Sequence, residues 1–411
     1  MTTHLPMPTS ELLTPDRARR LRILRAQLAV NFAFLVEGLG TGIWATHIPL
    51  IQARLAIDPA ILGIAIFVMA GASLITMPLA GVALGRLGSR PPTTATMIAF
   101  IVFLPLPMLA GTLPLFFVSL FVFGTTIGAL DVCMNVQATE VEAARGRPTM
   151  SSFHGFFSVG ALGGAGLGAV VISIGWGDGR GAALVAAVLF VLAIVAAFNL
   201  WPSTKATHAG PHFALPNRAA FALGVVVFLA FAIEGSVTDW SALFLTTIKH
   251  ADVAQAGAGF AAFSITMAIF RLGGDRVVAL LGPRTTVIGG GAVITGGLAL
   301  ALLAPWPALA AAGFALVGVG AANLVPVNFS AASRVPGMAP NLSIAAVTTM
   351  GYAGFLSVPP ILGFVAHTFS LSATVALAGL MGAAVAVIAW VIMPRRYATA
   401  GPINQKKKGR P

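Results

Sequence analysis

Four carboxylates lie inside long apolar stretches of the sequence and are the residues best placed to do chemistry. The chain has only 12 Asp and Glu residues, and Glu37, Asp131, Glu234 and Asp239 have almost entirely apolar flanks. A carboxylate at the centre of a bilayer opposes insertion by about 2.5 to 3.5 kcal/mol, so such residues usually face a wet cavity or a partner. A carboxylate removed from water also holds a proton more readily, which suits it to carry one.

Two of these carboxylates have polar or aromatic residues at helical spacing. Positions four and seven residues along a helix return to nearly the same direction. We therefore expect two acidic faces opposed across a central cavity, with the alternative that each carboxylate only hydrogen-bonds a neighbouring helix. For the two tryptophans, an interfacial aromatic belt is the alternative to a solute contact. The two faces consist of Glu37, Thr41 and Trp44, and of Glu234, Thr238, Ser241 and the nearby Trp240.

A third group of polar residues surrounds Asp131. Asn135 follows Asp131 by four residues and shares its helix face. His154 begins the next apolar stretch and is a candidate relay partner for Asp131, although a histidine at a helix start is often an interfacial hydrogen-bonding residue. Asp131, Asn135 and His154 are therefore placed with Glu37 and Glu234 as the leading site residues.

Prolines mark a second tier of cavity candidates. Pro326 and the pair Pro359-Pro360 are expected to interrupt two apolar stretches, where freed carbonyls need other partners. Residues at such breaks can act as hinges or as solute ligands. Plain helix packing is an equal alternative. The second-tier residues near these breaks are Asn323, Asn328 and Tyr352.

Other kinds of chemistry find no support in the sequence. Gly160, Gly164 and Gly168 lie in an apolar stretch with no strand before it, which favours close helix packing over a nucleotide-binding loop. The single cysteine, Cys133, excludes disulfides and cysteine-based zinc sites within the chain. No Walker sequence, metal-ligand cluster or nucleophile motif is present, so we expect no catalytic residue, no metal, no cofactor and no enzyme.

Composition shows which elements must position these residues. The chain of 411 residues is 57% hydrophobic and 9% charged, far below the soluble average of about 25% charged. The net charge of +12 is concentrated beside the first and last apolar stretches, which is typical of membrane flanks and not of a nucleic-acid binder. We therefore predict an all-α membrane protein whose partner is the lipid bilayer and not nucleic acid.

A bilayer crossing takes about 20 apolar residues, and this criterion predicts twelve membrane-spanning helices. With both termini on the cytoplasmic side, only Arg54, Arg180 and Lys249 fall in outward loops, out of 24 Lys and Arg residues. The predicted spans are 26–48, 60–84, 93–111, 114–139, 150–174, 181–201, 219–247, 255–279, 285–304, 307–332, 342–367 and 371–393.

The sequence contains an internal duplication. Glu37-Gly38 followed by Trp44 recurs as Glu234-Gly235 followed by Trp240, and Asn135 and Gly155 recur as Asn328 and Gly351, all near one offset. Two parallel halves with a binding site between them are the arrangement of one large transporter class. The expected organisation is a segment at 1–25, a six-helix bundle at 26–201, a linker at 202–218, a second six-helix bundle at 219–393 and a basic tail at 394–411.

Two loops carry a resemblance to a known family. The loop after the second span runs from Gly81 to Arg90 and resembles the Gly-x-x-x-Asp-Arg-x-Gly-Arg-Arg/Lys signature of the major facilitator superfamily, but Gly85 stands where the Asp is usual. In that family this loop latches the two halves, which leaves Asp275 in the matching loop as the better acidic partner. Simple positive-inside loops are the alternative. The candidate gating residues are Gly81, Arg86, Gly88, Arg90, Asp275, Arg276 and Arg284.

A second stretch, from Asp131 to Gln137 with Glu140, Glu142 and residues 151–158, resembles a bacterial branch of this superfamily that includes fucose-permease-like and rhizopine-transport-like proteins. Transporters of the first kind pair an acidic residue in the first helix with one in the fourth, and Glu37 with Asp131 reproduces that pair. The resemblance implies proton-coupled symport in a bacterial inner membrane. We assign Asp131 as the proton carrier and Glu37 as a solute ligand or second titrating group.

The sequence thus predicts a secondary transporter, with a small polar solute of sugar-like or polyol-like character and protons as its partners. It is expected to act as a monomer by rocking of one half against the other. Export of a small molecule on the same fold, or a non-transporting receptor or scaffold, are the alternatives.

Overall fold

The described part of the chain is helical and contains no strand. The computed structural model describes residues 15–57, 59–202, 215–251 and 258–393. The helices are α1 (Pro15–Leu55), α2 (Pro59–Leu87), α3 (Arg90–Phe103), α4 (Leu106–Leu109), α5 (Leu113–Arg145), α6 (Met150–Ser173), α7 (Arg180–Asn199), α8 (Arg218–Thr247), α9 (Ala258–Leu272), α10 (Gly274–Leu281), α11 (Pro283–Leu303), α12 (Pro307–Ala321), α13 (Leu324–Ala332), α14 (Pro340–Thr368) and α15 (Leu371–Ile392).

Eleven helical stretches in the described residues are long and apolar enough to cross a bilayer. Two of them join consecutive helices, α3 with α4 and α12 with α13. The apolar helix α9 is shorter and completes the predicted set of twelve, although residues 252–257 before it lie outside the description. The predicted span 255–279 was too long at its end, because α9 stops at Leu272 and the separate helix α10 follows Gly273.

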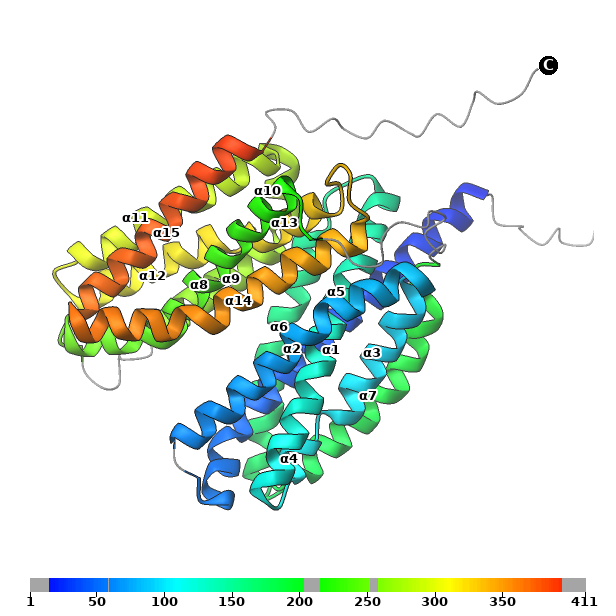
Figure 1. The fold of residues 1–411 in the computed structure, drawn as a ribbon, viewed down its shortest axis with the longest axis horizontal. Helices are drawn as coiled ribbons and strands as arrows, with labels where there is room; N and C mark the ends of the chain where they lie inside the picture. Colours follow the sequence, from blue (N-terminus) through cyan, green and yellow to red (C-terminus); the bar gives the residue numbers. More distant parts are fainter. Residues whose placement is uncertain (1–14, 58, 203–214, 252–257, 394–411) are drawn as a thin grey trace, which may run out of the picture.

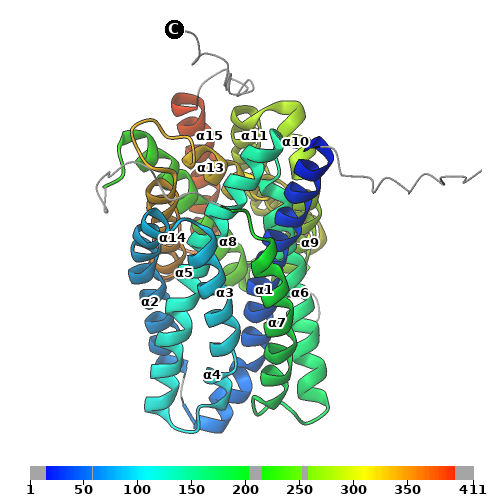
Figure 2. The ribbon, with the colours of Figure 1, turned by 90° about the vertical axis from the view of Figure 1, so that its right-hand side faces the viewer.

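The helices form two bundles, α1–α7 and α8–α15 (Figure 1). The beginning of α1 and the end of α15 lie at the same end of the molecule, which we call the termini side, and the opposite end is the far side (Figures 1 and 2). The bundles approach each other at the termini side and diverge toward the far side (Figure 1). The expected all-α fold of two bundles is therefore present.

The two halves repeat the same hydrogen bonds. Arg54, at the end of α1, donates to the carbonyl of Ala110 at 3.0 Å, and Lys249, after α8, donates to the carbonyl of Ala304 at 2.8 Å. In each case a cation on the far side satisfies carbonyls left free at the end of a neighbouring helix. Positions 54 and 249, and positions 110 and 304, differ by nearly the same offset as the sequence duplication.

A second repeated pair lies on the termini side. Arg90 donates to the carbonyl of Ala197 at the end of α7, at 3.1 Å, and Arg284 donates to the carbonyl of Trp390 at the end of α15, at 2.7 Å. Each arginine lies in the first turn of the third apolar span of its half and holds the end of the sixth. The duplication seen in the sequence therefore extends to atomic contacts that build the same frame twice.

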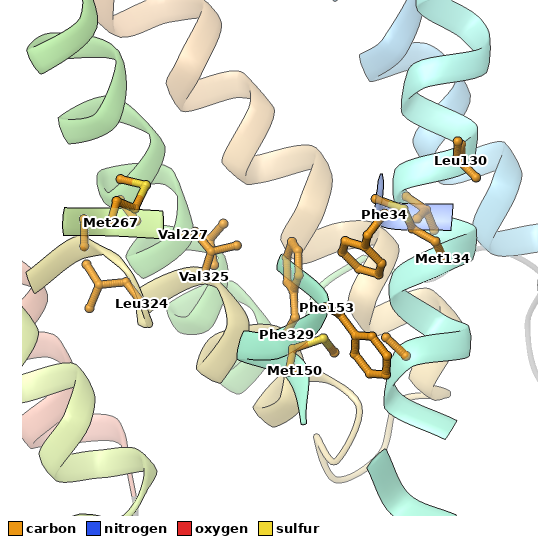
Figure 3. Packing of buried hydrophobic residues seen from close by; sticks show 14 of the residues in the cluster. Phe34, Leu130, Met134, Met150, Phe153, Val227, Met267, Leu324, Val325 and Phe329 are labelled. Atoms are coloured by element: carbon orange, nitrogen blue, oxygen red, sulfur yellow. The ribbon is translucent and has the colours of Figure 1, made fainter. Parts of the chain in front are cut away.

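Apolar side chains from both halves belong to one buried cluster (Figure 3). Phe34 on α1 and Phe153 on α6 stack with ring centroids 5.8 Å apart, and Phe329 on α13 belongs to the same buried cluster. Met150 and Leu324 extend this cluster along α6 and α13 (Figure 3). The halves are thus joined through a packed apolar contact as well as through polar ones.

Small residues bring α1 and α6 into close contact. A Cβ added at Gly160 or Gly164 would overlap the backbone of Leu35 or Leu39 on α1. Such approach of backbones is how small residues every fourth position stabilise membrane helix pairs. The structure therefore confirms that this glycine series allows close helix packing and does not form a nucleotide-binding loop.

Gly164→Val should therefore destabilise the protein by about 1 to 3 kcal/mol, the usual cost of overpacking. The matched control is Gly166→Val on the same helix, because a Cβ there meets nothing within 4 Å. Thermal unfolding of the two purified variants checks the prediction. Equal unfolding temperatures for both would contradict the assigned contact.

Of the two expected proline breaks, the one in the tenth span is present and the one at residues 359–360 is not. The interruption in the tenth span lies between Ala321 and Leu324, before Pro326, which is tolerated in the first turn of α13 because that turn needs no backbone donor there. Helix α14 continues through residues 359–360, so the pair does not interrupt its span.

The predicted domain limits fall largely outside the description. Residues 203–214 of the linker, 394–411 of the tail and 1–14 of the first segment are not described, so these limits stay predictions.

Candidate functional site

Two buried carboxylates of the first half lie next to each other. Glu37 on α1 is 2% exposed and Asp131 on α5 is 6% exposed, and the two are close enough to interact electrostatically. Glu37 Oε2 and Asp131 Oδ2 are buried and accept no hydrogen bond from the described residues. Two adjacent carboxylates in a low-dielectric site resist being charged together. This pair can therefore take up and release a proton.

A chain of polar contacts leads from Asp131 to α6. The side-chain amide of Asn135 donates to Asp131 Oδ1 at 2.9 Å and to the Asp131 carbonyl at 2.9 Å. His154 Nε2 lies 3.2 Å from Asn135 Oδ1. The residues grouped from the sequence are thus in contact, with Asn135 between the histidine and the carboxylate.

His154 is held by aromatic rings from both halves. Its ring lies 5.0 Å from that of Phe34 on α1 and 5.7 Å from that of Phe329 on α13, measured between centroids. Arg271 of the second half is near enough to act on it electrostatically. His154 therefore occupies the boundary between the bundles and not an interfacial position at the membrane surface.

Tyr352 on α14 brings the second half to the carboxylate pair. Its hydroxyl neighbours Asp131, and Glu37 also acts on it electrostatically. Its ring packs edge-on against Phe231 of α8, with centroids 5.7 Å apart. Glu37 and Asp131 are themselves closed to solvent in this conformation, and the expected cavity between the two acidic faces stays a prediction.

Glu234 has a partner that the sequence did not predict. Arg271 on α9 forms an ion pair with Glu234 at 2.8 Å, and their side chains are 7% and 18% exposed. The same guanidinium donates to the carbonyl of Ala322 at the α12–α13 break and to Ser158 Oγ of the first half at 3.4 Å. Glu234 therefore differs from Glu37, because a cation compensates its charge.

The hydroxyl residues of the two acidic faces bond to their own helices. Thr41 donates to the Glu37 carbonyl at 2.8 Å, and Thr238 donates to the Glu234 carbonyl at 2.8 Å. Both threonines are exposed. Ser241 is buried with an unpartnered hydroxyl beside α9, so it does not continue their exposed face.

The remaining candidates are mainly packed. Trp44 is buried against Phe116, so it builds the core of its half and neither lines an open cavity nor faces lipid. Asn328 donates to the Leu324 carbonyl at 2.7 Å, and Asn323 donates to the Phe270 carbonyl at 3.3 Å. The side-chain oxygens of both asparagines are buried without a partner, which leaves each able to accept one hydrogen bond.

Asp275 connects the halves on the termini side. The Ser152 backbone N–H donates to Asp275 Oδ1 at 3.2 Å, and the Ser152 hydroxyl donates to Oδ2. Ser152 lies in the first turn of α6, so a carboxylate of the second half caps a helix of the first. Burial raises the pKa of the Asp275 carboxyl, and the hydrogen bonds from Ser152 oppose that rise.

Asp275→Asn keeps an acceptor oxygen but removes the negative charge at the N-terminus of α6, so it should loosen the first turn of α6 by about 0.3 to 1 kcal/mol, or up to about fivefold in opening. Hydrogen exchange of residues 150–154 measures this effect. Asp178→Asn, in an exposed pair with Arg180, is the control and should leave α6 unchanged. Unchanged exchange in Asp275→Asn would exclude the capping role.

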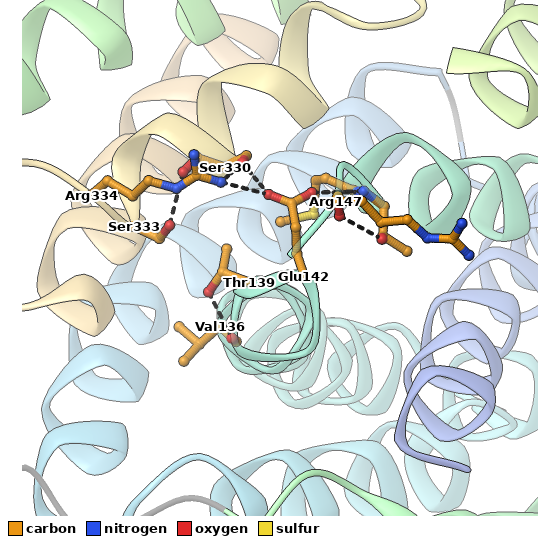
Figure 4. A network of polar contacts seen from close by, with 9 residues as sticks. Val136, Thr139, Glu142, Arg147, Ser330, Ser333 and Arg334 are labelled. Carbon is orange, nitrogen blue, oxygen red and sulfur yellow. Dashed lines mark hydrogen bonds and ion pairs between the residues drawn. The ribbon is translucent and has the colours of Figure 1, made fainter. Parts of the chain in front are cut away.

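A second connection on the termini side centres on Glu142 of α5 (Figure 4). Its Oε2 accepts hydrogen bonds from the backbone N–H groups of Thr149 and Met150 at 2.8 and 3.0 Å. Its Oε1 accepts from Arg334 of the second half at 3.0 Å and from the Ser330 hydroxyl. Glu142 and Asp275 thus cap the same helix from opposite halves.

The predicted loop from Gly81 to Arg90 is mostly helical, because α2 continues to Leu87, and the end of α2 contacts the second half. Asn341 of α14 donates to the Gly81 carbonyl at 2.6 Å, and its amide nitrogen would lie 3.0 Å from a Cβ at Gly85. An Asp at position 85 would therefore meet Asn341. Without that carboxylate, the end of α2 contacts the second half through the hydrogen bond from Asn341 to the Gly81 carbonyl.

The other predicted gating residues stay within their own halves or at the surface. Gly88 supplies a left-handed turn with φ of 79°, and Arg86 and Arg276 are exposed. Arg90 and Arg284 hold α7 and α15, as described above, and do not cross between the bundles. Arg90 and Arg284 thus stabilise the frame, whereas Asp275 and Gly81 take part in the contacts that cross between the halves.

Comparison with known proteins identifies the family. The Major Facilitator Superfamily profile matches residues 30–248 and 223–411, and together these segments cover most of the chain. The chain belongs to the major facilitator superfamily. An uncharacterised MFS-type transporter of Yersinia pestis is 38% identical over 346 residues, covering 84% of this chain and 90% of that protein. The membrane protein MosC of Rhizobium meliloti is 33% identical over 348 residues, covering 84% of each chain.

Solved structures share the superfamily fold. FucP in its outward conformation matches with a TM-score of 0.77 at 12% identity, covering 90% of this chain and 99% of that one. The xylose transporter XylE matches with a TM-score of 0.73 at 13% identity, covering 92% and 97%. At this identity the likeness concerns the fold alone. The family match and the relatives, and not these structures, show that the chain is a secondary transporter. Its many apolar helices fit a protein that spans a membrane several times.

Sequence reasoning missed Arg271, Glu142 and Arg334. Arg271 was not considered individually, although it lies among apolar residues of the eighth predicted span and could have been singled out on that ground. Glu142 was noted only within the stretch that resembles the bacterial branch, and Glu142 and Arg334 each lie just past a span end, where charges are usual, so their contact was not predicted. In the described residues, no group of three or more His, Cys, Asp or Glu side chains is arranged to hold a metal.

Proposed function

We propose that this major facilitator protein couples proton movement to the transport of a small polar solute of sugar-like or polyol-like character. The observation that carries the proposal is the buried pair of Glu37 and Asp131, each with one carboxylate oxygen that lacks a partner. No cation from the described residues forms an ion pair with either, so protonation is the available means of neutralising them.

The position of the pair supports coupling. Asp131 connects through Asn135 to His154, and His154 and Tyr352 lie where the bundles meet. A change in the protonation of Asp131 thus acts on contacts between the halves. Rocking of one bundle against the other would expose the pair to each side in turn.

The solute class is supported by the character of the site and by structural neighbours. Tyr352 provides a neutral hydrogen-bonding group beside the carboxylates, and the buried Asn323 and Asn328 of the second half each have an unused acceptor. FucP is described as a fucose:proton symporter, and XylE as a proton:xylose symporter bound to a glucose derivative. For this chain a sugar-like solute is the proposal that these features support.

The orientation is part of the proposal. We place the termini side in the cytoplasm of a bacterium, because basic residues are concentrated there. The contacts of Asp275, Glu142 and Asn341 then form the cytoplasmic gate, closed in this conformation. The protein is proposed to work as a monomer in the inner membrane.

Proteoliposomes with an imposed pH gradient test the proposal. The purified protein is first screened against sugars, polyols and amino acids by thermal shift, because a ligand stabilises the state that it binds. A stabilising radiolabelled solute is then expected to accumulate above its external concentration only while the gradient lasts. Extrusion driven by the opposite gradient would indicate an exporter. Binding without flux in either direction would indicate a receptor and contradict the proposal.

A further inference from the structure

A pocket of about 460 Å³ opens on the termini side, away from the carboxylate pair, between the start of α1, the start of α3 and the end of α7. This volume is within the range of about 300 to 1,000 Å³ that small-molecule sites occupy. Three arginines and no carboxylate line it, and its other walls are largely apolar. The residues that matter here are Leu21, Arg22, Arg25, Arg90, Phe198 and Leu200.

The floor of the pocket is fixed by hydrogen bonds. Arg90 donates from Nε to the Ala197 carbonyl at 3.1 Å and from Nη2 to the Phe198 carbonyl at 3.2 Å. Gln137 of α5 donates to the Trp201 carbonyl at 3.0 Å and accepts from the Trp201 N–H at 2.9 Å. The end of α7 and the residues after it are therefore held in place before any ligand arrives.

The α1 wall concentrates positive charge without compensation. Arg22 and Arg25 are three positions apart, so they lie on one face of the helix. In the described part of the chain neither forms a hydrogen bond or an ion pair. Like charges at this spacing repel each other, and a shared anion relieves that repulsion. Guanidinium groups match the oxygens of a phosphate ester in particular.

We propose that this pocket binds the phosphate headgroup of an anionic phospholipid. Arg22 and Arg25 directly precede the first apolar span, which places them at headgroup level. Leu24 and Leu28 of α1 are 50% and 57% exposed, and Phe198 of α7 is 75% exposed. These side chains offer an apolar surface beside the pocket for acyl chains, which a free phosphate ion would not use.

The flanking sequence supports a lipid over a segment of this chain. The tail at 394–411 carries six Lys and Arg residues and no acidic residue, so its charge has the same sign as the pocket. Inorganic phosphate shares the recognised chemistry and is distinguished by experiment. The inference is independent of the proposed solute and of proton coupling.

The test measures thermal unfolding of the purified full-length protein in detergent with three probes. These are phosphatidylglycerol, phosphatidylcholine with the same acyl chains, and inorganic phosphate. Phosphatidylglycerol should raise the unfolding temperature saturably, since a ligand of the folded state stabilises it, and the other two should not. Arg22→Gln/Arg25→Gln should weaken the apparent affinity for phosphatidylglycerol by about tenfold or more, through loss of two charge-assisted contacts.

The matched control is Arg19→Gln/Arg20→Gln, which removes the same charge from the same helix outside the pocket and should keep the lipid response. Arg22→Lys/Arg25→Lys provides a second variant that keeps the charge, and it should retain part of the affinity because Lys lacks the planar fork of Arg. Equal loss in both Gln variants would overturn the proposal. The proposal would also be overturned if inorganic phosphate raised the unfolding temperature, phosphatidylglycerol did not, and the Arg22 and Arg25 substitutions abolished the phosphate response.

Discussion

Asp131→Asn should abolish accumulation of solute in proteoliposomes with an imposed pH gradient, leaving the internal concentration no higher than the external one. Asn keeps the size of the side chain and can still contact Asn135, but it cannot gain or lose the proton that the proposal assigns to this position. Exchange of solute at equal concentrations needs no net proton movement, so it should continue. Comparing gradient-driven uptake with equilibrium exchange separates coupling from binding.

The control for Asp131→Asn is Asp239→Asn on α8. Asp239 is also a carboxylate in an apolar stretch, but it is exposed and does not interact electrostatically with Glu37 or Asp131. Its replacement should leave accumulation at the normal level. If Asp131→Asn accumulates solute as well as the unaltered protein does, Asp131 is not the proton carrier.

Arg271→Ala should destabilise the protein by about 3 to 5 kcal/mol, because removal of one partner leaves the other charge buried and unpaired. Both side chains of the Arg271–Glu234 pair are largely buried, so solvent screens the charges little. The loss also removes donors from the Ala322 carbonyl and from Ser158. Unfolding in mixed micelles measures the change in free energy.

A double-mutant cycle isolates the ion pair from the other contacts. Glu234→Gln/Arg271→Gln should recover a large part of the stability lost in Arg271→Ala, because no buried charge is left alone. Arg180→Gln, which breaks an exposed pair with Asp178, should leave the unfolding free energy unchanged. A double variant as unstable as Arg271→Ala would show that Arg271 acts through Ala322 and Ser158 and not through Glu234.

The sequence was sufficient for the fold and for the residues that share one half. Hydrophobic spans and the duplication predicted two bundles, and helical spacing predicted that Asp131 and Asn135 share a face. The family resemblance added the pairing of Glu37 with Asp131, and the structure places these residues and His154 together. Their roles in transport stay predictions.

Contacts between elements distant in the chain were not predictable in the same way. Nothing in the sequence fixes the rotation of α9 that turns Arg271 toward Glu234, because that rotation depends on packing against α12 and α6. The same limit applies to Glu142 and Arg334, which come from different halves. The offset of the duplication could match Arg90 in the first half with Arg284 in the second. It could not reveal that each arginine binds the end of a neighbouring helix.

The repeated frame has a consequence for how the protein can change over generations. The amide of Asn135 reaches back to Asp131 in the first half, and that of Asn328 reaches back to Leu324 in the second, so one member of the matching positions is titratable and the other is inert. The helix-end contacts held in duplicate involve none of these positions, so the two copies of such a position can differ while the shared frame stays intact. A substitution in one copy can therefore change the polar groups of one half without a matching change in the other.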